Sequence, residues 1–261
     1  MGYRGGSSPQ MNMVPITPVV KWLIGINVGI WLVLQVIVEQ YVLREPFFTM
    51  VFGLVPQTFI QKFFVWQPFT YMFLHSHSPF HILFNMLLLW WLGSELEGRW
   101  GSKFFLIYYL ASGIGAGLIY GIVTLIYTLL VGVSSVWTVP VVGASGAIFG
   151  LMLAYGIIFG ERVVYFMMVF PMRAKYFVMI LGGVEVVTLL NNGFAGGEVA
   201  NLAHVGGLIS GFVFLRLYTR FKQGKWRKKS GQRGRGLKLV VNNDKKENGK
   251  GDNGKGPRYW N

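Results

Sequence analysis

Long apolar stretches separated by short polar segments fill the chain between residues 19 and 218. A bilayer core about 30 Å thick needs roughly 20 consecutive apolar residues in a helix that crosses it. Six stretches meet or approach this length, so the pattern predicts an all-α membrane protein, a polytopic bundle of six transmembrane helices. We expect these helices at residues 19–38, 69–92, 104–131, 144–160, 176–190 and 200–218.

A further apolar run at 163–170 is too short to span a bilayer alone and is followed by Pro171, Arg173 and Lys175. We expect this run to lie at the membrane interface or to lead into the fifth helix. A seventh span here is the alternative topology.

The charges in the loops orient the predicted bundle. An even number of spans places both termini on one side, and Lys and Arg concentrate on the cytoplasmic side of a membrane protein. The loops expected outside, 39–68, 132–143 and 191–199, contain only Arg44 and Lys62 as basic residues. The loops expected inside contain Arg99, Lys103, Arg162, Arg173 and Lys175. We therefore expect a multi-pass cell-membrane protein with both termini in the cytoplasm.

Composition supports this class and limits the chemistry. Hydrophobic residues make up 53% of the 261 residues and charged residues 13%, which is typical of a polytopic helical membrane protein and unlike a soluble domain. The chain has no cysteine, which excludes a disulfide, a thiolate metal site and a cysteine nucleophile.

Most of the net charge of +14 lies in the C-terminal tail, where the residues from Arg216 onward include 15 Lys and Arg and three acids. Because this tail follows a hydrophobic span, we expect it to bind anionic lipid head groups and not a specific nucleic acid. The predicted organisation is a cytoplasmic segment at 1–18, a six-helix domain at 19–218 and a disordered cytoplasmic tail at 219–261.

A serine and a histidine in two of the apolar helices are the candidate nucleophile and base. Ser145 lies at the start of the fourth predicted helix, and His204 lies near the outer end of the sixth. A histidine near neutral pH is suited to take the proton of a serine hydroxyl. Gly143 and Gly146 leave room for a substrate carbonyl, and the N–H groups at the helix start, for which we expect those of Gly143 and Ser145, can stabilise an oxyanion.

The same glycines support a purely structural interpretation. Glycines four residues apart let membrane helices pack closely, and Ser145 would then be an interhelical hydrogen-bonding group. This spacing occurs at Gly146 and Gly150, at Gly113 and Gly117, and at Gly207 and Gly211.

The second predicted helix contains His75, His77, His81 and Asn85. His81 and Asn85 are four residues apart and share one helix face, where both can point at one oxygen and form a side-chain oxyanion hole. Alternatives are a metal site, or polar groups that pair with each other. The segment HSHSPFH lacks the acid of the HExxH motif and no cluster of acids or cysteines completes a site, so we expect no metal. His75 and His77 are expected to face the membrane interface.

The motifs together resemble one family. HILFN at 81–85, GASGAIFG at 143–150 and AHVGG at 203–207 stand in order on the second, fourth and sixth predicted helices, and EGRWGS follows at 97–102. In these motifs, and over roughly residues 19–218, the chain resembles the rhomboid intramembrane serine proteases. The six-span form is similar to the basic bacterial type, which implies a bacterial plasma membrane.

The resemblance implies roles for single residues. Ser145 would be the nucleophile, His204 the base, and His81 with Asn85 would help hold the oxyanion. The family uses a dyad without an essential third carboxylate and no cofactor. Accordingly we expect no acid beside His204, and assign no role to Glu198, the nearest acid in sequence. The aromatic residue four positions after the serine packs on the histidine in this family, and here it is Phe149.

The resemblance also implies roles for two loops. The aromatic-rich loop 39–68 would be a lateral structural element at the membrane edge, although an ordinary amphipathic loop fits the sequence equally well. The glycine-rich loop 191–199 would cap the active site.

These observations predict an intramembrane serine endopeptidase that cleaves transmembrane segments of other membrane proteins. A helix shields its own carbonyls, so its substrates would contain small or helix-breaking residues near the cleavage point. Two other classes stay open: a rhomboid-like protein that binds membrane clients without cutting them, and a small-molecule transporter.

Overall fold

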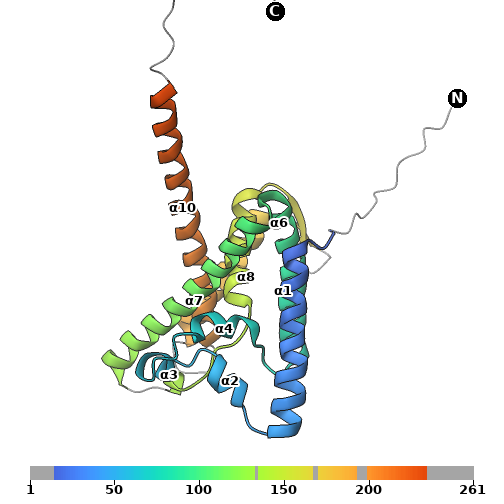
Figure 1. Ribbon diagram of the computed structural model, residues 1–261, viewed down its shortest axis with the longest axis vertical. Coiled ribbons are helices and arrows are strands. Elements are labelled where there is room, and N and C mark those ends of the chain that lie inside the picture. Colours follow the sequence, from blue (N-terminus) through green and yellow to red (C-terminus); the bar gives the residue numbers. More distant parts are fainter. Residues whose placement is uncertain (1–14, 133–134, 167–169, 193–198, 234–261) are drawn as a thin grey trace, which may run out of the picture. The chain divides into compact units, whose positions relative to one another are not determined.

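The computed structural model describes residues 15–132, 135–166, 170–192 and 199–233, and most of these residues are helical (Figure 1). The chain divides into two units, residues 1–219 and 220–261. The prediction of a helical membrane bundle is confirmed.

Four of the described helical stretches are long and apolar enough to cross a membrane, as judged by length and composition. The fourth predicted span, α8 (Ser145–Ile158), is apolar but shorter. The count of six spans therefore stays a prediction. The four long stretches are Pro18–Leu43, Ser102–Val131, Ala174–Asn191 and Ala200–Gln223.

The first stretch consists of α1 (Pro18–Gly29) and a more widely wound continuation, η1 (Ile30–Leu43). Proline suits the first turn of a helix, where its missing N–H would have had no partner. One face is buried and the other leaves large apolar side chains such as Trp22 and Val33 exposed, as a helix that faces lipid requires.

The second predicted span was placed partly wrongly. Residues 67–73 form two short helices, α4 (Gln67–Thr70) and η2 (Tyr71–Phe73), and the long helix begins only at Pro79. A proline disfavours helical geometry in the residue before it, and Ser78 is accordingly extended. From there α5 (Pro79–Leu88), η3 (Leu89–Gly93) and α6 (Ser94–Trp100) follow one another without a break to Gly101, whose φ of 81° ends the run.

Two short helices, α2 (Phe47–Phe52) and α3 (Pro56–Gln61), occupy the loop that follows η1. Glu39 holds this loop to η1, because its carboxylate accepts hydrogen bonds from the backbone N–H of Thr49 at 3.0 Å and from its hydroxyl at 3.1 Å. The aromatic side chains of Phe47 and Phe63 are exposed. The lateral position at the membrane edge stays a prediction.

The described residues of the apolar run at 163–170 do not form a seventh span, and the run leads through a strand into the fifth helix. Its described residues belong to an antiparallel hairpin of β1 (Val163–Phe166) and β2 (Phe170–Arg173), with Val163 paired to Arg173. Beside the hairpin, Glu161 accepts hydrogen bonds from Arg173 at 2.7 Å and Lys175 at 2.5 Å. The fifth predicted helix, α9 (Ala174–Asn192), starts directly after β2.

The core surrounds α8, which contacts α5, η3, α7 (Ser102–Val131) and α9 (Figure 1). Because α8 is apolar on all sides, burial of the whole helix is its stable arrangement. Two tyrosine hydroxyls near it find backbone acceptors: the Tyr71 hydroxyl donates to the carbonyl of Gly113 at 2.7 Å, and the Tyr108 hydroxyl to that of Gly150 at 2.8 Å. The last described helix is α10 (Val199–Arg233).

Glu97 in α6 caps the start of α1. Its carboxylate accepts hydrogen bonds from the N–H groups of Val19 and Val20, both at 3.1 Å, from the Ser102 hydroxyl at 2.6 Å and from the Thr17 hydroxyl. Burial by itself raises the pKa of this carboxyl, but the hydrogen bonds outweigh it and lower the pKa below its ordinary value. Ionised Glu97 therefore stabilises the fold.

The pKa of Glu97 in the folded protein lies below that of an ordinary glutamate. The stabilisation that ionised Glu97 gives to the fold is therefore complete above the ordinary glutamate pKa, and it is lost as the pH falls through the lower pKa of the folded protein. We expect Glu97→Gln to lower the free energy of unfolding at neutral pH by about 1–3 kcal/mol, as charged hydrogen bonds contribute. Thermal unfolding in detergent across acid pH should show this difference shrinking. A difference that is independent of pH would contradict the prediction.

The matched control is Glu161→Gln. The pKa of Glu161 is also lowered, chiefly by its hydrogen bond with Lys175, but the side chain is 69% exposed. Exposed ion pairs contribute little to stability, so this variant should unfold near the temperature of the parent protein.

Candidate active site

Ser145 and His204 lie within hydrogen-bonding distance. Ser145 is the first residue of α8, His204 lies in α10, and the Ser145 Oγ and His204 Nε2 atoms are 2.8 Å apart. At this distance the hydroxyl can donate its proton to the ring nitrogen, which is the geometry that activates a serine nucleophile.

Two glycines bring these side chains together. A Cβ atom on Gly207 would collide with the backbone carbonyl of Gly146, and one on Gly146 would lie 2.9 Å from both the Tyr71 hydroxyl and the Ala116 Cβ. The helices of Ser145 and His204 can cross this closely only because Gly207 lacks a side chain, and Gly146 leaves room for Tyr71 and Ala116. The close packing and the Ser145–His204 contact are therefore parts of one arrangement and not alternatives.

Phe149 lies one turn after Ser145 on α8, and its ring stacks on the imidazole of His204. The ring centroids are 4.3 Å apart and the planes differ by 15°. This contact fixes the plane of the imidazole, while the serine contacts one of its edges.

His81 lies across Gly143 from Ser145. A Cβ atom on Gly143 would lie 3.0 Å from His81 Nε2 and 3.5 Å from Ser145 Oγ, so the missing side chain keeps the space between them clear. Gly143 also has a φ of 132°, a backbone conformation that favours glycine.

The hydrogen bonds of His81 assign its tautomer. Its Nδ1 accepts the backbone N–H of Ser76 at 3.2 Å and lies 3.0 Å from the Ser76 hydroxyl. A backbone N–H only donates, so Nδ1 of the neutral ring is unprotonated and Nε2 bears the hydrogen. The Trp31 indole N–H donates to the Ser76 carbonyl at 3.0 Å and so steadies this segment from η1. His81 thus presents a donor toward Gly143.

The other expected oxyanion donors differ in availability. The Ser145 N–H is the first of α8 and has no acceptor within that helix. The buried Asn85 amide donates one hydrogen to the His81 carbonyl at 2.8 Å and retains a second. The Gly143 N–H donates to the Tyr71 carbonyl at 3.0 Å, so Gly143 contributes space instead of a donor.

The expectation that His75 and His77 both face the interface is wrong for His75. Its side chain is fully buried, and the Gln35 amide from η1 holds its backbone through hydrogen bonds of 2.7 and 2.8 Å. The ring packs edge-on against His81, with centroids 5.2 Å apart. His77 is exposed. Within the described ranges, no three His, Cys, Asp or Glu side chains form a group that could hold a metal ion.

Sequence reasoning missed an acid beside the histidine. Glu185 in α9 places its Oε2 atom 3.0 Å from His204 Nδ1, and the two side chains are only 17% and 15% exposed. The two atoms are close but not aligned for a hydrogen bond. The expectation that no acid lies beside His204 is therefore wrong. Glu185 is the one acid in the apolar run 176–190, and an ionisable residue inside a span is a signal of function.

Two expectations fall outside the described residues. Glu198 and most of the loop 191–199 lie in the segment 193–198, for which the structure gives no description.

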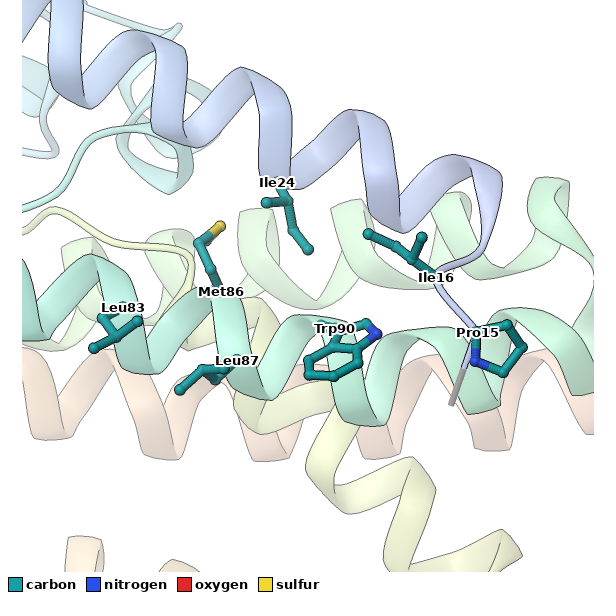
Figure 2. Close-up of a pocket in the computed structure, with 7 residues that line it drawn as sticks. All are labelled: Pro15, Ile16, Ile24, Leu83, Met86, Leu87 and Trp90. Atoms are coloured by element: carbon teal, nitrogen blue, oxygen red, sulfur yellow. The ribbon is translucent and has the colours of Figure 1, made fainter. Parts of the chain in front are cut away.

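An apolar pocket of about 660 Å³ lies between the start of the first helix and the helix that bears His81. Figure 2 shows Ile16 and Ile24 on one side and Leu83, Met86 and Trp90 on the other. These walls offer no nucleophile, acid or base, so the pocket is not the place of the chemistry.

Comparison with known proteins gives a consistent picture. The family model of the rhomboid domain matches residues 62–221. Rhomboid protease GluP of Bacillus subtilis (strain 168) is 35% identical over 150 residues, which cover 56% of this chain and 25% of that protein. RHOMBOID-like protein 1 of Arabidopsis thaliana is 32% identical over 155 residues, 59% of this chain and 34% of that protein.

Rhomboid protease GlpG of Yersinia pestis (strain Pestoides F) is 30% identical over 158 residues, which cover 60% of this chain and 49% of that protein. The chain thus spans between a quarter and a half of the length of these curated relatives.

Proposed function

The chain belongs to the rhomboid family, and on that premise we propose that it is an intramembrane serine endopeptidase that cleaves transmembrane segments of other membrane proteins. The observation that carries the proposal is the 2.8 Å contact between Ser145 Oγ and His204 Nε2 at the start of a buried helix.

In the first step, Ser145 Oγ attacks the carbonyl carbon of the substrate peptide and its proton passes to His204 Nε2. The carbonyl oxygen becomes an oxyanion in the space that Gly143 keeps clear. Donors from His81 Nε2, the Ser145 N–H and the second amide hydrogen of Asn85 stabilise this charge.

When the tetrahedral intermediate collapses, the C–N bond breaks and the leaving amine takes the proton from His204 Nε2. The acyl group stays on Ser145 as an ester. A water molecule then gives its proton to His204 and attacks the ester, and the returned proton restores the Ser145 hydroxyl.

The setting of the reaction is part of the proposal. We place the six-span bundle in a bacterial plasma membrane with both termini in the cytoplasm and the basic tail on anionic lipid head groups. Substrate segments would have to unwind to expose a carbonyl, because a helix already hydrogen-bonds its own. Segments with glycine or other helix-weakening residues are the expected substrates.

A fluorophosphonate probe tests the proposal on the detergent-solubilised protein. We expect Ser145 Oγ to displace fluoride from phosphorus, so that peptide mass spectrometry finds the adduct on Ser145, and the same preparation should cleave a model single-span substrate. Binding of membrane clients without either reaction would instead favour a non-cutting rhomboid-like protein. Solute-dependent transport without labelling would favour a transporter.

A further inference from the structure

Glu185 is the one acid that the described residues bring to the ring of the base. It reaches His204 from α9, at the Nδ1 edge of the ring opposite the edge that contacts Ser145. The Phe149 ring of α8 stacks on the face of the same imidazole. Residues from two other helices, α8 and α9, therefore contact the ring of His204. Resting on the proposed function, we propose that Glu185 is a positioning residue that extends the Ser145–His204 pair to a serine–histidine–glutamate triad.

Burial of the Glu185 carboxyl group inside a span costs free energy unless a polar group such as the ring of His204 compensates for it. A carboxylate inside a membrane span is expensive and is normally paired with another polar group. Among the described residues, the acids Glu95 and Glu161 have Arg or Lys partners, whereas the ion-pair contact of Glu185 is with His204. Both Glu185 Oε2 and His204 Nδ1 are buried, and neither has a hydrogen-bond partner in the described part of the chain.

An acceptor beside His204 Nδ1 assists the chemistry of the dyad. For His204 Nε2 to accept the serine proton, the neutral ring must bear its hydrogen on Nδ1. The Glu185 oxygen, 3.0 Å away, is placed to favour that tautomer. When Nε2 takes the proton, the ring becomes a cation beside a carboxylate, and their attraction is strong because little water surrounds them.

In this arrangement Glu185 orients His204 and transfers no proton itself. The contact is not yet aligned as a hydrogen bond, and such contacts often tighten only when the substrate is bound. Because Phe149 fixes the plane of the imidazole, we expect a rotation of the Glu185 carboxylate to align the two atoms.

Glu185→Gln tests the proposal because it keeps the shape and removes the charge. We expect kcat for a single-span substrate to fall at least about 10-fold, as in other proteases that lose the carboxylate behind the histidine, while KM changes little. Fluorophosphonate labelling of Ser145 should slow by a similar factor. Glu185→Asp keeps the charge and should recover part of the loss, and both variants should unfold near the temperature of the parent protein.

Glu45→Gln is the matched control, since Glu45 is exposed in the loop before α2 and lies outside the catalytic machinery. It should keep the kcat of the parent. If the parent protein cleaves and Glu185→Gln keeps its kcat, the inference is overturned and the proposed function stands. A fall in kcat that follows a fall in unfolding temperature, with no recovery in Glu185→Asp, also overturns it. A parent that neither labels nor cleaves overturns both.

Discussion

Ser145→Ala and His204→Ala should each lower kcat for substrate cleavage by about 10⁴-fold or more, and the double variant should be no slower than either single variant. The reason is the 2.8 Å contact between the two side chains. A serine without a base is a poor nucleophile and a base without a serine has nothing to activate, so the loss of one partner already removes the contribution of the other.

Cleavage rates and fluorophosphonate labelling of all three variants measure this effect. Matched controls are Ser78→Ala and His77→Ala, because both side chains are exposed just before α5 and neither is placed in the active site. The controls should cleave like the parent protein. Losses that multiply in the double variant would show that the two residues act separately.

Gly207→Ala should both destabilise the protein and disable the site. A Cβ atom at Gly207 would collide with the Gly146 carbonyl, which is backbone and cannot turn away. The two helices must therefore separate, at a cost of about 1–3 kcal/mol in the free energy of unfolding. Because Ser145 lies next to Gly146, the same shift lengthens the 2.8 Å contact with His204, and a displacement of about 1 Å can cost roughly 100-fold in rate.

Gly183→Ala is the matched control for this substitution. Gly183 lies on α9, and a Cβ atom there would meet nothing within 4 Å. Thermal unfolding in detergent and cleavage rates should be close to those of the parent protein. Normal activity in Gly207→Ala would mean that the helices can part without separating the dyad.

The residues that local patterns identify are those whose neighbours are close in sequence. Ser145 stands among glycines at a helix start, and Phe149 lies one turn later, so helix periodicity alone places both on one face. His81 and Asn85 are related in the same way. The order of the predicted spans placed His204 on the same side of the membrane as Ser145. The glycines that bring the two residues within reach were recognised as a helix-packing motif.

The errors arose where a distant partner decides the outcome. Glu185 and His204 lie on different helices, and their contact depends on the rotation of α9, which an apolar sequence does not reveal. His75 stands just before a helix that begins at a proline, and a histidine at such a place is expected to be exposed. It is buried because Gln35 holds its backbone.

The hairpin of β1 and β2 was missed for a different reason, because a short apolar run has no distinctive period.

The cap that Glu97 places on α1 has a consequence for the order of biogenesis. The N–H groups of Val19 and Val20 and the Thr17 hydroxyl find their acceptor 77 to 80 residues later in the chain. While the protein is being synthesised, α1 therefore enters the membrane with an incomplete amino end. We expect it to remain undocked until the ribosome has released α6, so that the first helix made is among the last to settle into place.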